Sequence, residues 1–192
     1  MESNNNSQII IGENLENSKT IINLLLKGKH IFSGKEYAEL KANLDFYSKI
    51  FGLMDLDLHF HDMDFFYLRK NEKNMASSAK SICLFFFILL RRISIIENDP
   101  NPDLTRPSGF DKSLMRVEGL SSKDRALLEE QKIYDNDGID KVIRNMKGLG
   151  FLLIDEDGER IIFNRPIYRL MELSSDILKE FSQKEEGEEE WL

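Results

Sequence analysis

Two histidines and two aspartates lie close together in one short stretch, and side chains of these types bind zinc. His59 and His61 alternate along a predicted strand and so share one face, with Asp62 and Asp64 just beyond them. Two imidazoles and a carboxylate would supply three ligands of a tetrahedral zinc site. No fourth ligand is evident, and residues at the tip of a hairpin are seldom held rigidly enough for a metal. The sequence therefore favours the polar face and tip of a hairpin over a metal site.

Features that would indicate an enzyme are missing from the sequence. The only cysteine, Cys83, lies in an apolar run, where burial disfavours the reactive thiolate. The phosphate-binding patterns G-x-x-x-x-G-K-[ST] and G-x-G-x-x-G do not occur. Residues 135–138 resemble part of a calcium loop, but Ile133 and Arg144 stand where that loop needs carboxylates. We therefore expect no enzymatic activity, no metal and no cofactor.

Basic side chains gather on one face of a predicted helix, where they could bind phosphate. Lys141, Arg144 and Lys147 recur every third residue and so lie on the polar side of this helix. In many DNA-binding proteins a helix of this kind enters the major groove. Arg69 and Lys70 follow an earlier predicted hairpin and could extend the patch. These five residues are the candidate DNA contacts, and the alternative is an ordinary solvated helix face.

The basic face belongs to a helix that runs into a hairpin. Asp137 stands at the expected N-cap, and Gly148 is the expected left-handed residue that ends the helix. Strands are predicted at 151–154 and 160–163, joined by an Asp-Gly turn. A short helix that passes through a glycine into a hairpin is typical of the end of a winged-helix domain. The apolar positions that predict the helix are Ile139, Val142, Ile143 and Met146.

A similar pattern occurs earlier in the chain. A helix predicted over residues 37–51 carries an apolar stripe, and Gly52 stops it as Gly148 stops the later helix. Strands predicted at 54–60 and 65–69 then form a second hairpin. This first unit shows one helix fewer before its hairpin, so either its long helix does two jobs or the unit is a variant. The repetition favours two small domains in tandem.

Caps, apolar runs and breakers define the remaining elements. Ser33 and Glu36 are spaced as a capping box at the start of the long first-unit helix. Arg91 and Arg92 suit the negative end of a strongly apolar helix, and Pro166 suits the first position of a C-terminal helix. The other expected segments are helices at 13–27, 76–96 and 121–131, an extended segment at 30–32 and a loop at 97–112.

The expected fold class is therefore α+β and mostly helical, with two tandem winged-helix domains, a C-terminal helix and an acidic tail. The predicted boundaries are a mobile N-terminus at 1–12, an N-terminal winged-helix domain at 13–72, a second at 76–165, the C-terminal helix at 166–183 and the tail at 184–192.

The charge distribution limits the functions open to this chain. Its net charge is −8, and residues 176–192 hold seven acidic side chains against two lysines. An acidic chain of this kind is not a strong autonomous DNA binder through bulk charge, although a local basic face remains possible. Since 41% of the residues are hydrophobic, the chain can bury a core, which argues against global disorder.

The sequence also indicates a cellular compartment. A single cysteine forms no intramolecular disulfide, which fits a reducing environment. No signal peptide is visible at the start. The apolar run at 82–90 is far shorter than the ~20 residues that span a bilayer. We expect a soluble, cytoplasmic protein without a membrane partner.

Several segments spread along the chain form a recognisable pattern. They are LLKGKHI, a helix with Leu44-Asp45-Phe46-Tyr47 and Phe51, DMDFFYLRK, the apolar helix at 76–96, RNMKGLGFLLI and IYRLMELSSDI. Together these segments resemble the MukE and MksE family, the small accessory (KITE) subunits of bacterial Muk-type SMC condensins. The resemblance covers about residues 15–178, or most of the chain.

This resemblance implies a non-catalytic subunit that forms a homodimer and binds a MukF- or MksF-like kleisin. Through the kleisin it would join a MukB- or MksB-like SMC ATPase, and DNA would be contacted by the assembled complex. The role would be chromosome condensation and segregation at the nucleoid, or defence against plasmids. The alternative from a different class is a free-standing winged-helix transcriptional regulator, which would need specific affinity for duplex DNA.

Overall fold

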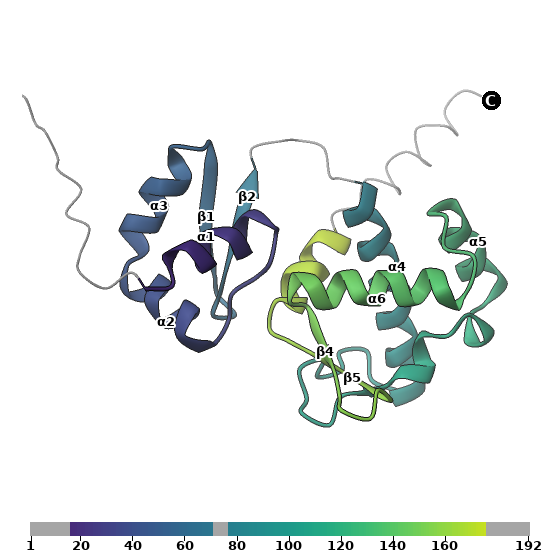
Figure 1. The fold of residues 1–192 in the computed structure, drawn as a ribbon. Helices are drawn as coiled ribbons and strands as arrows, with labels where there is room; N and C mark the ends of the chain where they lie inside the picture. The colour runs from purple at the N-terminus through teal and green to yellow at the C-terminus, as the bar shows by residue number, and fades with distance from the viewer. Residues whose placement is uncertain (1–15, 71–76, 176–192) are drawn as a thin grey trace, which may run out of the picture.

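A computed structural model describes residues 16–70 and 77–175. The expectations for the N-terminus at 1–12 and the acidic tail at 184–192 lie outside these residues. Figure 1 shows two units side by side, one built from α1–α3 and a hairpin and the other from α4–α6 and a small sheet. The first unit contains α1 (Ser18–Leu26), α2 (Gly34–Ala42), α3 (Leu44–Gly52), β1 (Leu56–His61) and β2 (Phe65–Lys70).

The prediction of one long helix over residues 37–51 is wrong, because the chain forms two helices, α2 and α3, that meet at Asn43. The backbone of Asn43 leaves the helical region, with φ −124° and ψ 35°. Its backbone N–H and its side-chain amide both donate to the carbonyl oxygen of Glu39, at 3.0 and 2.9 Å, so Asn43 closes the end of α2. The first unit therefore has three helices before its hairpin, and the apparent missing helix is present.

The N-terminal hairpin gains a third extended segment. β1 and β2 pair antiparallel, from Leu56 opposite Lys70 to His61 opposite Phe65. Ile31 forms a bridge with Phe66 in which the two residues exchange backbone hydrogen bonds of 3.0 and 2.8 Å. The extended segment expected at 30–32 is thus confirmed.

Helix α2 starts where expected but without the predicted capping box. Ser33 is its N-cap residue, yet the Ser33 side chain makes no capping hydrogen bond. Glu39 instead ties the three helices together, since its carboxylate accepts hydrogen bonds from Asn17 ahead of α1 and from Tyr47 in α3. The core of this unit comprises Ile21, Leu25, Ile31, Leu40, Tyr47, Phe51 and Phe66.

The second unit repeats this order of elements: a helix, a short strand, two helices and a hairpin. Its three-stranded sheet has the order β3-β5-β4, so the short strand pairs with the last strand, as Ile31 pairs with β2 in the first unit. The elements are α4 (Ser77–Glu97), β3 (Phe110–Asp111), two 3-10 turns (Lys112–Met115 and Val117–Gly119), α5 (Ser122–Glu130), α6 (Asn136–Leu149), β4 (Leu152–Ile154) and β5 (Arg160–Phe163).

The prediction of a loop over residues 97–112 is wrong near its C-terminal end, where Phe110 and Asp111 form β3. Phe110 pairs with Ile161 of β5. Gly109 makes this pairing possible, because its φ is +59° and a Cβ there would lie 2.5 Å from the Ile161 carbonyl oxygen. Only glycine avoids both the backbone strain and the clash.

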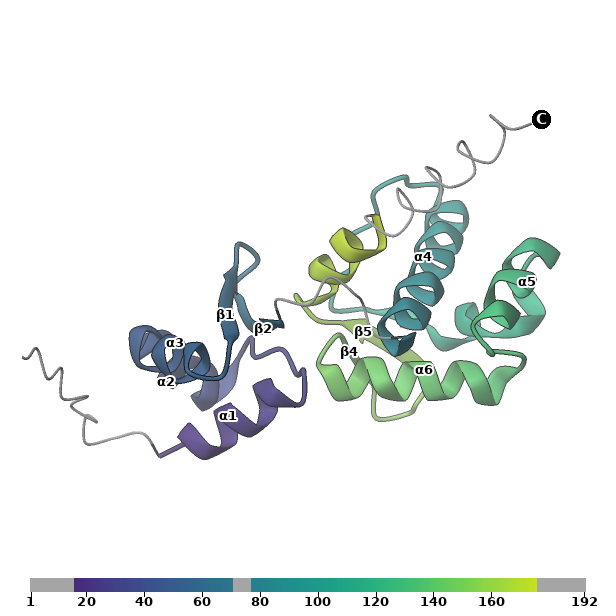
Figure 2. The same ribbon diagram turned by 90° about the horizontal axis from the view of Figure 1, so that it is seen from above.

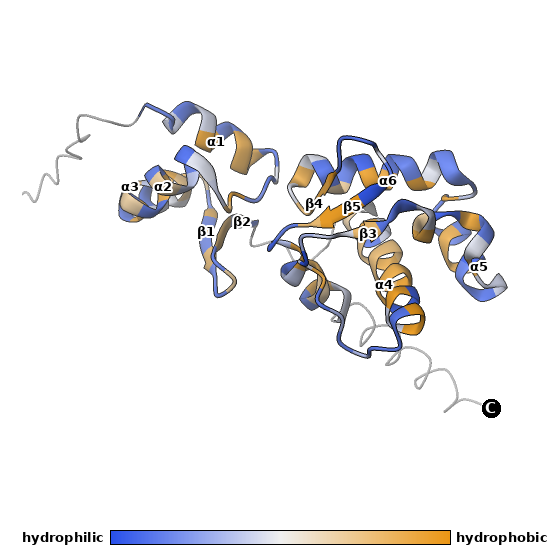
Figure 3. Cartoon of the chain, turned by 90° about the horizontal axis from the view of Figure 1, so that it is seen from below, coloured by the Kyte–Doolittle hydropathy of each residue, from blue (hydrophilic) through white to orange (hydrophobic). Residues whose placement is uncertain are grey.

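Helix α4 is the central element of the second unit, and it is apolar over most of its surface (Figure 3). Arg91 and Arg92 do not lie in its last turn, as their predicted role required, because the helix continues to Glu97. Arg91 pairs with the buried carboxylate of Asp124 in α5, and Arg92 donates to the carbonyl of Leu114 at 2.8 Å. Both arginines therefore fasten α4 to neighbouring segments.

The predicted caps of α6 are both shifted by two residues. Asp135, not Asp137, is the N-cap, and its side chain accepts from the Gly138 backbone N–H at 2.8 Å. Gly150, not Gly148, has the left-handed conformation at the C-terminal end, with φ 87°. The apolar stripe of the helix is confirmed, since Ile139, Val142, Ile143 and Met146 are all buried.

The C-terminal helix packs into the core of the second unit. It covers residues 167–175 of the described chain, directly after Pro166, and Ile167 and Leu170 are buried beside α4 residues. The expected apolar positions at 177, 178 and 181 lie outside the described residues. The remaining core residues of this unit include Phe86, Leu89, Ile93, Phe110, Leu152, Ile161 and Phe163.

The architecture confirms an α+β fold that is mostly helical, with two small antiparallel sheets. Seen from above, the loop after α1 lies beside the end of α6, so the two units meet there (Figure 2). None of the described helices is both long enough and apolar enough to cross a membrane.

Candidate functional site

Helix α6 presents the three candidate DNA-contact residues that it carries on its solvent face. Lys141, Arg144 and Lys147 are all exposed, opposite the buried apolar stripe. Asp135 and Gly150 hold the two ends of the helix, so the cations project from a rigid element. This face can bind an anion such as a phosphate without rearrangement of the backbone.

Asp140, in the middle of α6, does not pair with the basic side chains of that helix. Asp140 faces the other way and lies 3.6 Å from Lys112 Nζ and 3.4 Å from Arg116 Nη1. Within the described part of the chain, no ion pair involves Lys141, Arg144 or Lys147.

The other two candidate residues are not brought to the α6 face by any contact among the described residues. Arg69 is exposed on β2, and its charge acts on Arg169 in the C-terminal helix. Lys70 ends β2, and its side chain lies outside the description. The candidate surface thus centres on α6.

His59 and His61 lie on one strand of the hairpin, with His61 at its end as expected, but their rings pack on the aromatic residues of the paired strand. His59 stacks on Tyr67, with ring centroids 5.3 Å apart, and His61 stacks on Phe65 at 4.3 Å. His61 Nε2 also lies 3.2 Å from a carboxylate oxygen of Glu172 in the C-terminal helix. Across residues 16–70 and 77–175, no three potential ligands gather into a metal site. His61 therefore joins the hairpin to the C-terminal helix, and His59 packs within the hairpin.

His30 is the buried centre of the contact between the two units. Its backbone N–H and its ring Nδ1 both bond to the Leu149 carbonyl oxygen, each at 3.0 Å. The ring also lies 4.6 Å from that of Phe151. Burial lowers the pKa of His30 to about 4, so the ring is neutral at pH 7. Because a carbonyl only accepts, the proton of the neutral ring sits on Nδ1.

Asp64 makes a second connection between the units. Its carboxylate accepts hydrogen bonds from Tyr37 and Lys41 in α2, and from Arg165 at 2.7 Å. The Tyr37 hydroxyl, followed by Lys41 and Arg165, lowers the pKa of Asp64 to about 2. Arg169 adds a cation–π contact, 3.7 Å from the Tyr67 ring centroid.

Cys83 is a packing residue, as expected. Its side chain is buried in α4, and burial raises the pKa of the thiol to about 11. A thiol at that pKa carries almost no thiolate at pH 7. Cys83 is therefore not an activated nucleophile.

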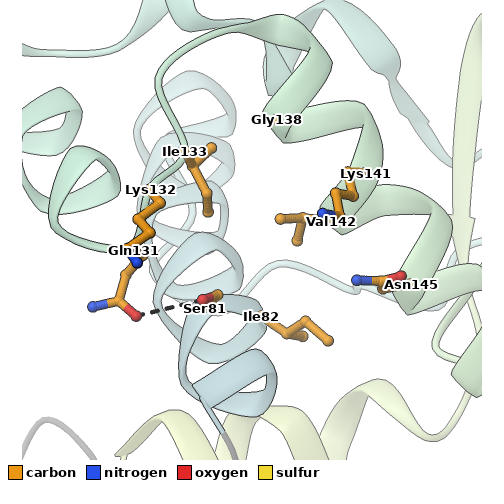
Figure 4. A pocket seen from close by; sticks show the side chains of 9 residues that line it. All are labelled: Ser81, Ile82, Gln131, Lys132, Ile133, Gly138, Lys141, Val142 and Asn145. Carbon is orange, nitrogen blue, oxygen red and sulfur yellow. Dashed lines mark hydrogen bonds between the residues drawn. The ribbon is translucent and has the colours of Figure 1, made fainter.

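A groove runs beside the basic face of α6, between this helix and the N-terminal part of α4 (Figure 4). Its volume is about 290 Å³. Ile82, Ile133 and Val142 supply apolar surface, and Lys141 and Asn145 stand along the α6 side. A second hollow of about 420 Å³ continues from Ile82 and Asn145 to Arg144 and Lys27.

Sequence reasoning missed Lys27 and Lys132, which line this groove, and His30 and Arg165, which join the units. Lys27 and Lys132 come from segments more than 100 residues apart, so no local spacing could associate them. Arg165, beside the predicted helix start at Pro166, carried no signal of its partner Asp64.

Comparison with known proteins shows the class of protein to which this chain belongs, which is that of the condensin complex proteins. The family model described as "Condensin complex protein MksE" matches residues 16–174, which is most of the chain and both units. The chain therefore belongs to the MksE family, and the resemblance found in the sequence is confirmed. A search of curated proteins gives no match.

Proposed function

We propose that this chain is a non-catalytic accessory subunit that binds the kleisin of a bacterial condensin and forms a homodimer. The observation that carries the proposal is the MksE family match over residues 16–174. The SMC ATPase would join through the kleisin, and the complex would act at the nucleoid in chromosome organisation or in plasmid defence.

The two units are, in this proposal, tandem winged-helix domains within residues 13–72 and 76–165. Their shared order of elements supports this assignment, as does the pairing of a short extended segment with the last strand in each. Helix α6 occupies the position of the helix that precedes the hairpin, which in DNA-binding domains of this kind often enters the major groove.

The exposed cations of α6 support the proposal that the assembled complex contacts DNA. Lys141, Arg144 and Lys147 project from a helix held at both ends, and they have no acidic partner in the described residues. Three cations on a chain of net charge −8 fit a modest, shared DNA contact better than autonomous binding.

The experiment that tests the proposal is co-expression with the kleisin encoded beside this chain, followed by size-exclusion chromatography with light scattering. We expect one complex whose mass corresponds to a kleisin with dimers of this subunit. Separate elution of the two proteins would reject the proposal. Tight, specific binding of the lone protein to its own promoter would then support the transcriptional regulator instead.

A further inference from the structure

The groove beside α6 combines an apolar floor with a basic rim. Its two hollows share Ile82 and Asn145, so they form one continuous depression along the helix. Ile133 and Val142 extend the apolar floor in the first hollow, and Leu149 extends it in the second. Figure 4 shows the side chains of the first hollow converging from α4, α6 and the segment that joins α5 to α6.

Four cations stand around this depression. Lys132 and Lys141 line the first hollow, and Lys27 and Arg144 line the second. All four are exposed, and none takes part in an ion pair within the described residues. The lining residues of the two hollows include no acidic side chain. Charge complementarity therefore selects an acidic occupant that also carries a large apolar side chain.

The chain itself contains a segment of this chemistry. Residues 185–190 include five glutamates, and they are followed directly by Trp191 and Leu192. Trp191 is the only tryptophan of the chain. An indole offers a large apolar surface for the groove floor, and the glutamates offer the negative charge that its rim lacks.

The described structure ends close enough to the groove for this segment to reach it. Ser174 Oγ donates to the Cys83 carbonyl oxygen at 3.2 Å, and Cys83 is the neighbour of Ile82 in α4. Residues 184–192, which follow the predicted C-terminal helix, can span up to roughly 30 Å when extended. Ser174 thus contacts the same helix, α4, that lines the groove through Ile82, and an α-helix is about 10–12 Å in diameter.

We propose that the acidic segment 185–192 docks in the groove of its own chain. Trp191 enters the apolar floor at Ile82 and Val142, and the glutamates lie beside the four cations. The docked segment covers Lys141 and Arg144, so it competes with DNA for them. This last consequence rests on the proposed function, whereas the docking itself does not.

Fluorescence of Trp191 in the full-length protein without DNA or kleisin tests the docking directly. We expect an emission maximum at shorter wavelength than in the urea-unfolded chain, and acrylamide quenching at least about threefold weaker. Lys141→Glu with Arg144→Glu should return both values to those of the unfolded chain. The matched control Lys19→Glu with Lys49→Glu makes the same change in net charge at exposed positions of α1 and α3 and should leave both values unchanged.

Salt provides a second test that changes no residue. At about 1 M NaCl the Debye length falls to about 3 Å, so the contacts between glutamates and cations weaken and quenching of Trp191 should increase. Circular dichroism under the same conditions verifies that the fold is retained.

Three outcomes would overturn the docking proposal. Trp191 could be fully exposed in the wild-type protein, or it could be buried equally in the Lys141→Glu, Arg144→Glu variant, which would place the segment elsewhere. A loss of burial on hundredfold dilution would assign the groove to the segment of a second copy.

The competition with DNA has its own readout. Trp191→Ala keeps all glutamates, so it removes the anchor without changing net charge. DNA binding by the assembled complex should strengthen severalfold in this variant, and unchanged affinity would reject the competition. If no variant binds DNA, the DNA part of the proposed function fails, while the fluorescence result still decides whether the segment docks.

Discussion

The Leu149 carbonyl oxygen accepts two hydrogen bonds from His30, one from the backbone N–H and one from ring Nδ1, each 3.0 Å long. Leu149 is the last residue of α6, so this pair joins the end of the basic helix to the first unit. The relationship fixes α6 against residues that lie 119 positions away in the chain. The orientation of the candidate DNA-binding helix is therefore linked to the contact between the units.

The stability of the protein should fall with decreasing pH because of His30. Its pKa is about 4 in the folded state, against an ordinary value of 6.5. Below pH 6.5 the unfolded chain takes up a proton that the folded chain refuses, and the folded state loses up to roughly 3 kcal/mol by pH 4. Urea denaturation at several pH values between 5 and 6.5 measures this slope.

The variant His30→Phe isolates this effect, because it keeps an aromatic ring against Phe151 but cannot titrate. In this variant the unfolding free energy should change less steeply with pH over the same interval, by about 1 kcal/mol per pH unit. Equal slopes in the variant and the wild type would contradict the burial of a neutral His30.

Glu39 should be the most sensitive polar position of the first unit. Its carboxylate accepts from the hydroxyl of Tyr47 at 2.5 Å, and Tyr47 is fully buried. Glu39→Ala leaves that hydroxyl without a partner and should cost about 1–3 kcal/mol of unfolding free energy. Denaturation of Glu39→Ala, Tyr47→Phe and the double variant should show a double loss smaller than the sum, whereas strict additivity would argue against the contact.

The sequence was a good guide to elements with a strong period and a poor one to breaks within them. The apolar spacing Tyr37, Leu40, Leu44 and Tyr47 continues across Asn43, and Leu40 and Tyr47 do pack in one core, although Leu44 is exposed. Periodicity alone therefore predicts one helix where there are two. β3 could not be predicted either, since a strand of two residues has no period, and Phe110 pairs with Ile161, which is 51 residues away.

The candidate site shows the same division. The exposed face of α6 was predictable because its cations and its apolar stripe share one helical period. The roles of His30, His61 and Arg165 were not, because each depends on a partner from the other unit: Leu149, Glu172 and Asp64. Packing between distant segments leaves no local pattern.

Gly109 and Gly158 make a matched pair for testing the β3–β5 contact. Both have positive φ, +59° and +75°, but a Cβ at Gly158 meets nothing within 4 Å. Gly158→Ala should cost about 1–2 kcal/mol from backbone strain alone. Gly109→Ala adds a clash with the Ile161 carbonyl and should cost roughly 3 kcal/mol or more. Equal losses in urea denaturation would mean that β3 does not approach β5 as described.

Charge reversal on α6 tests its contact with phosphate. Arg144→Glu with Lys147→Glu should weaken DNA binding by the assembled complex and reduce the slope of log K against log salt by about 2, since each phosphate contact contributes about 0.9. The control Lys19→Glu with Lys49→Glu has the same net charge and should retain the wild-type slope. An unchanged slope in the α6 variant would assign that face to solvent.

The most direct test of the account is a tagged pull-down of this protein from its native host, read by mass spectrometry. The proposed function predicts recovery of a kleisin together with a large coiled-coil ATPase. Recovery of neither, with the protein eluting alone, would contradict the proposed role as a condensin subunit.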